Sequence, residues 1–127
     1  MRNKQASATV SAASCRSNDL TCGGKGLFLW CLPIVAVVVG SSWSNMRTWL
    51  WIPAFLVMGI GCVANAARCG RVHCYFTGPL FLLAAVYTVL AEIHLVPMHP
   101  TVLLDTVVIL ALLAYMAEFR FGRYRKT

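Results

Sequence analysis

The segment from residue 68 to residue 79 contains the side chains best suited to chemistry. Cys69, His73 and Cys74 stand together there, with the guanidinium groups of Arg68 and Arg71 beside them. Thiols and an imidazole are ligands that suit Cu(I), Zn(II) or Hg(II). The neighbouring positive charges favour the thiolate, which is the form that binds metal. We therefore expect a soft-metal site at these residues, and a loop that docks a partner protein is the competing interpretation.

Three further cysteines extend this set. Cys62 shares a predicted helix face with Cys69, seven positions later, which places it as an intramembrane step toward the segment. Cys15 and Cys22 stand in the polar N-terminal segment and are predicted to act as the acceptor of the metal ion. Cys31 is interpreted as a packing residue of an apolar helix, and packing is the competing interpretation for Cys62. No set of nucleophile, base and orienting group is visible in the sequence, so we do not expect an enzyme.

A second group of polar side chains lies near the ends of the later apolar runs. Ionisable groups at membrane depth are costly, so each is a functional candidate. Imidazoles, a thioether and carboxylates could together capture a soft cation. The competing interpretation is that these side chains simply reach water at the membrane surface. The group consists of Glu92, His94, Met98, His99 and Asp105.

Composition predicts a small membrane protein with one domain. Of its 127 residues 59% are hydrophobic and only 12% are charged, whereas a soluble domain has about 25% charged residues. The apolar runs are continuous, which favours membrane-spanning helices. The predicted spans are 27–43, 48–67, 78–96 and 101–119, between a disordered tail, 1–26, and a basic tail, 120–127. The first run is short, and three spans would remain if it does not cross.

The basic residues orient these spans. Along the chain the tails and links carry 4, 1, 2, 0 and 4 of them. This alternation places both termini in the cytoplasm by the positive-inside rule. All six cysteines then fall in the cytoplasmic half, where thiols stay reduced. Trp43, Trp49 and Trp51 would gather at the outer interface.

The net charge of +7 is interpreted as membrane topology rather than nucleic-acid binding. In the C-terminal segment basic residues alternate with aromatic ones, which is typical of an anchor on anionic head groups. We expect Glu118 to pair with Arg120 or Arg123. The predicted head-group anchor comprises Arg120, Arg123, Arg125 and Lys126.

The string from Asn65 to Pro79, NAARCGRVHCYFTGP, together with FGRYR near the C-terminus, resembles a signature of small, uncharacterised bacterial membrane proteins. That resemblance implies location in the bacterial cytoplasmic (inner) membrane and carries no assigned activity. In size and thiol content the chain is also loosely similar to bacterial mercury-resistance membrane proteins. Those carry an adjacent Cys-Cys pair in the first span, where this chain has Cys31 alone.

Together these features predict an all-α, four-helix transmembrane bundle. The function expected is the transport, relay or sensing of a thiophilic ion such as Hg(II) or Cu(I), and a soft metal ion is the only cofactor implied. The alternative is a non-catalytic accessory or scaffold subunit of a larger membrane complex. Expected partners are the lipid bilayer and either further copies of the chain or a larger complex, because small residues in the second span permit close helix contact.

Overall fold

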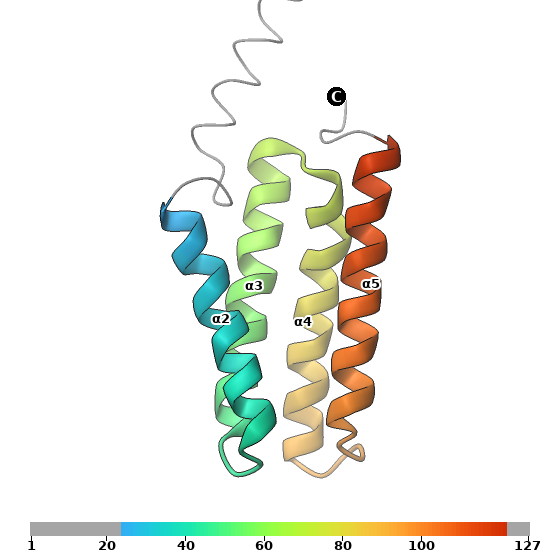
Figure 1. The fold of residues 1–127 in the computed structure, drawn as a ribbon. Helices are drawn as coiled ribbons and strands as arrows, with labels where there is room; N and C mark the ends of the chain where they lie inside the picture. Colours follow the sequence, from blue (N-terminus) through green and yellow to red (C-terminus); the bar gives the residue numbers. More distant parts are fainter. Residues whose placement is uncertain (1–23, 122–127) are drawn as a thin grey trace, which may run out of the picture.

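The computed structural model describes residues 24–121, except for the side chains of Lys25 and Cys69. Over this range the fold is all-helical, as predicted, with α2 (Gly24–Ser42), α3 (Arg47–Cys69), α4 (Val72–Glu92) and α5 (Pro100–Phe121) (Figure 1). Helices α3, α4 and α5 are long and apolar enough to cross a membrane, whereas α2 contains a shorter apolar segment, Gly26–Ser42. These lengths suggest a membrane protein. A fourth crossing by α2 stays a prediction.

The helices stand side by side in chain order, and each runs opposite to the one before (Figure 1). Helix α3 packs between α2 and α4, and α5 packs on α4. The link between α3 and α4 lies at one end of the row, together with the last turn of α5. The other two links lie at the opposite end. We call these the α3–α4 end and the α4–α5 end.

Aromatic side chains fill the core between α2, α3 and α4. Trp51 and Phe55 are fully buried and meet edge to face at 5.9 Å, and Phe55 stacks on Phe81 at 6.4 Å. The indole Nε1 of Trp51 donates a hydrogen bond of 3.0 Å to the carbonyl of Val37 on α2. Trp51 fits there because Gly40 faces it: a Cβ at that position would lie 2.8 Å from the indole.

This burial corrects the expected position of one tryptophan. Trp51 does not lie at the interface, because its ring packs inward between α2 and α3. Trp43 and Trp49 are 63% and 81% exposed at the α4–α5 end and suit the interfacial role. Three tryptophans that lie close together in the sequence therefore have different surroundings, because only Trp51 is on the face of α3 that packs against α2.

Helix α4 begins at Val72, six residues before the predicted start at Gly78. Gly70 ends α3 in the left-handed conformation, with φ 63°, and its amide donates to the carbonyl of Ala66 at 2.9 Å. Arg71 is extended, and α4 follows at once. The link is therefore only Gly70 and Arg71. Of the residues between the two predicted spans, Arg68 and Cys69 end α3, and residues 72–77 form the first two turns of α4.

Helix α4 also ends early, at Glu92 rather than Val96. The amide of His94 donates to Ala91 at 3.1 Å and that of Leu95 to Leu90 at 3.0 Å. His94 has φ 60°. This is a Schellman motif with histidine in the left-handed position that glycine usually takes. The chain from residue 93 to residue 99 consequently forms a link at the α4–α5 end.

Candidate functional site

Two thiols meet between α3 and α4 near the α3–α4 end. Cys62 and Cys74 are both fully buried, and their side chains hydrogen-bond to one another. Asn65 Nδ2 donates to Cys74 Sγ at 3.8 Å. Thr77 Oγ1 lies 3.3 Å from Cys62 Sγ and 2.9 Å from the carbonyl of His73, so its single proton serves one of them at a time. We call Cys62 and Cys74 the dithiol.

Helical spacing and one close backbone approach bring the dithiol together. Cys62 and Asn65 are three residues apart on α3, and Cys74 and Thr77 are three apart on α4, so each pair shares a face. Gly78 lies between the helices, where a Cβ would be 2.8 Å from Val63 Cγ2. A side chain at that position would hold α3 and α4 apart, so the glycine is needed for the thiols to meet.

A histidine and a carboxylate continue from the dithiol to α5. His73 Nε2 lies 3.3 Å from Cys74 Sγ, and His73 Nδ1 bonds to a carboxylate oxygen of Glu118. Glu118 is only 5% exposed, and its other oxygen lies 3.7 Å from Arg71 Nη2. The carboxylate holds the ring so that Nε2 can accept a proton from the thiol. We call Cys74, His73 and Glu118 the relay.

The ring of His73 is further fixed by an aromatic neighbour on α5. Tyr115 meets it edge to face at 6.1 Å and in turn contacts Phe119 at 5.2 Å. Glu118 follows Tyr115 by three residues, so both reach α4 from one face of α5. Three helices therefore hold the thiols, the imidazole and the carboxylate in place.

Sequence analysis found the thiols and the imidazole but missed the carboxylate. It paired Glu118 with Arg120 or Arg123, whereas the structure pairs it with His73 and Arg71 across the helix interface. The signal that could have found it is an acidic residue inside an otherwise apolar helix, which requires a buried partner. The relay also has the order nucleophile, base and orienting carboxylate, an arrangement that local spacing did not reveal.

The predicted metal ligands divide into three groups. Cys62, His73 and Cys74 come together, and Cys69 is the last residue of α3. Cys15 and Cys22 lie outside the described residues. Within residues 24–121 no three His, Cys, Asp or Glu side chains converge as ligands around one point. The dithiol offers two soft ligands, the number that a linear Hg(II) or Cu(I) site uses.

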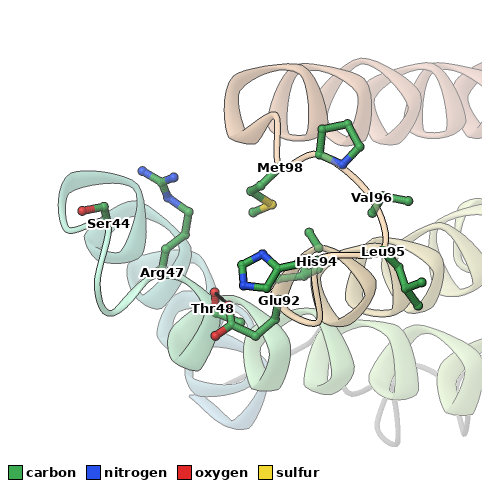
Figure 2. A pocket seen from close by; sticks show the side chains of 11 residues that line it. Ser44, Arg47, Thr48, Glu92, His94, Leu95, Val96 and Met98 are labelled. Carbon is green, nitrogen blue, oxygen red and sulfur yellow. Dashed lines mark hydrogen bonds between the residues drawn. The ribbon is translucent and has the colours of Figure 1, made fainter.

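At the α4–α5 end a cavity of about 460 Å³ opens between the start of α3 and the link that follows α4 (Figure 2). Three members of the predicted outer group line it, Glu92, His94 and Met98, whereas His99 and Asp105 are not part of its lining. Thr48 Oγ1 donates to Glu92 Oε2 at 2.8 Å across the α3–α4 interface. The predicted outer group is therefore only partly assembled.

Of the four residues in the predicted head-group anchor, only Arg120 lies within the described residues. Arg120 is exposed in the last turn of α5, which suits contact with lipid head groups. Arg123, Arg125 and Lys126 lie outside the described residues.

No family model, curated protein or solved structure matches this chain. The chemistry of the site must therefore be argued from its own side chains.

Proposed function

We propose that this protein handles a thiophilic ion, Hg(II) or Cu(I), at the cytoplasmic side of a bacterial inner membrane, and that the dithiol is the ion site. The observation that carries the proposal is the meeting of two buried thiols from two helices, with His73 Nε2 3.3 Å from one sulfur. Two thiols supply the soft ligands that such ions select. The ion is cargo rather than a resident cofactor.

Ion binding requires an acceptor for the thiol proton and a balance of charge in the buried site, and the relay supplies both. Each thiol must lose its proton to become a ligand: His73 accepts the proton of Cys74, and the proton of Cys62 is released to water as the ion binds. Glu118 stabilises the imidazolium that forms, because its carboxylate bonds to Nδ1. Hg(II) with two thiolates is neutral, and Cu(I) with two thiolates carries one negative charge that the imidazolium balances. Either product avoids an uncompensated charge in a buried site.

The charge distribution supports the proposed orientation. Among the described arginines, Arg68, Arg71 and Arg120 stand at the α3–α4 end and Arg47 at the other. Basic residues concentrate on the cytoplasmic side of membrane proteins. With the α3–α4 end in the cytoplasm, the dithiol faces a compartment that keeps thiols reduced.

Ion titration of purified protein tests the proposal. The starting variant carries serine in place of Cys15, Cys22, Cys31 and Cys69, so that the dithiol holds its only thiols. We expect it to bind one Hg(II) or Cu(I) per chain under anaerobic conditions, in competition with a small-molecule thiol. Adding Cys62→Ser or Cys74→Ser should abolish competitive binding.

The controls separate ion binding from the alternative function. Cys31→Ser alone, which changes an exposed thiol on α2, should leave the stoichiometry of the dithiol unchanged. If Cys62→Ser in the four-serine background binds as tightly as its parent, the dithiol is not the ion site. If folded parent protein binds neither ion, the accessory-subunit function takes the place of this proposal.

A further inference from the structure

The cavity at the α4–α5 end carries opposite charges on its two sides. Ser44, Arg47 and Thr48 line it from the link before α3 and the first residues of α3, and Glu92 and His94 line it from the end of α4 and the link that follows (Figure 2). We propose that this cavity binds a zwitterionic group composed of a phosphate and an ammonium, as in phosphoethanolamine. This inference is independent of the dithiol, which lies at the other end of the helices.

Arg47 forms the anion-binding side. Its Nε is buried and has no hydrogen-bond partner among the described residues. The guanidinium lies 5.7 Å from the ring of Trp51, which fixes the side chain against the core. A buried N–H without an acceptor is unfavourable, and a guanidinium prefers an oxyanion that can accept two bonds. A phosphate supplies that acceptor, with the hydroxyl of Ser44 on the same side of the cavity.

Glu92 forms the cation-binding side. One carboxylate oxygen accepts the bond from Thr48 at 2.8 Å, which orients the group and leaves the other oxygen for a ligand. His94 stands at the rim because its left-handed backbone ends α4 there. An anion alone would face the charge of Glu92, and a cation alone would face Arg47. A ligand with both charges satisfies both sides.

The position of the cavity relative to the membrane indicates which zwitterion it could meet. It lies where α3 begins and α4 ends, at the limits of two helices long enough to cross a membrane. The exposed indoles of Trp43 and Trp49 stand at the same end, and tryptophan concentrates at the level of lipid head groups. Its volume lies within the range of pockets for small ligands. A phosphoethanolamine group at that level could belong to a lipid head group or to a free molecule in solution.

Calorimetric titration in a lipid-free detergent tests the charge requirement. Probes are phosphoethanolamine, inorganic phosphate and ethanolamine. We expect saturable binding of phosphoethanolamine and at least about tenfold weaker binding of inorganic phosphate and of ethanolamine, which each carry charge of one sign only. Arg47→Gln should weaken phosphoethanolamine binding by about tenfold or more, and Glu92→Gln should weaken it while leaving phosphate binding equal or stronger. Arg68→Gln, an exposed change at the other end, is the matched control and should have no effect.

A second measurement shows whether the phosphoethanolamine group belongs to a lipid or to a free molecule. Protein is extracted from membranes that contain phosphatidylethanolamine and phosphatidylglycerol, and the retained lipid is identified by mass spectrometry. Retention of phosphatidylethanolamine that Arg47→Gln abolishes assigns the site to a lipid head group, and soluble binding without retention assigns it to a free molecule. If wild type shows neither, or if folded Arg47→Gln behaves as wild type in both, the proposal is overturned. Arg47→Lys, which keeps the charge, should retain part of the affinity if Arg47→Gln does not fold.

Discussion

The two ends of the molecule hold polar groups in opposite ways. At the α3–α4 end, Cys62, Cys74 and Glu118 are buried among three helices, and each bonds to a neighbour. At the α4–α5 end, Glu92 and His94 are exposed around an open cavity. The first end is built from helix faces and the second largely from a link. Neighbouring side chains therefore hold the polar groups in fixed positions at the first end, whereas those at the second end are exposed.

The links explain this difference. Gly70 and Arg71 alone join α3 to α4, so helix register fixes where His73 and Cys74 point. Seven residues, 93–99, join α4 to α5, and His94 among them takes a backbone conformation that glycine takes more readily. Substitutions should therefore affect stability strongly at the α3–α4 end and weakly, or with the opposite sign, at the α4–α5 end.

The largest effect is expected from Glu118→Ala. It removes a buried carboxylate that bonds to His73 and Arg71, and breaking such a pair costs about 3 kcal/mol. The measurement is the free energy of unfolding in detergent. Asp105→Ala, an exposed change on the same helix, should stay within about 0.5 kcal/mol of wild type. Equal losses from the two variants would remove the contrast between buried and exposed carboxylates.

A smaller loss is expected from Gly78→Ala. The added Cβ would lie 2.8 Å from Val63 Cγ2, and overpacking of this kind costs about 2 kcal/mol. Because α3 and α4 must separate, oxidative cross-linking of Cys62 to Cys74 should also slow. Gly24→Ala, where a Cβ meets nothing within 4 Å, is the matched control. Unchanged cross-linking in Gly78→Ala would show that the close approach at Gly78 is not what joins the thiols.

His94→Gly should have the opposite sign. Glycine adopts the left-handed conformation without strain, so the substitution should stabilise the protein by about 1 kcal/mol. A thermal denaturation series that includes His99→Gly, a change in the same link, controls for added chain flexibility. A loss of stability in His94→Gly beyond that of His99→Gly would mean that the imidazole itself stabilises the α4–α5 end.

The smallest effect is expected from Cys31→Ser. Cys31 is an exposed thiol on α2, so stability should change by no more than about 0.5 kcal/mol. Its exposure also predicts reactivity: a membrane-permeant maleimide should label Cys31 before Cys62 or Cys74, as followed by peptide mass spectrometry. Faster labelling of Cys74 would show that the dithiol opens readily, contrary to its burial.

The sequence predicted the helices but not the contacts between them. Continuous apolar runs specify helices of membrane length, and the observed bounds lie within a few residues of expectation at most ends. Gly78-Pro79 suggested the start of a helix, because proline usually stands in the first turn, yet α4 continues through Pro79. Glu118 lies 45 residues from His73, so no local spacing could join them. Burial of Trp51 likewise depends on Gly40, a residue of another helix.

The bond between Glu118 and His73 has a consequence for how the chain enters a bilayer. Helix α5 follows α3 and α4 in the chain and carries a carboxylate that pairs with His73, in the first turn of α4, and with Arg71, immediately before α4. An isolated α5 would have to hold that charge in lipid without a partner. If α3, α4 and α5 cross a membrane, the α3–α4 hairpin supplies the partners that the carboxylate on α5 requires, and the bond from Glu118 to His73 sets the register in which α5 packs on α4.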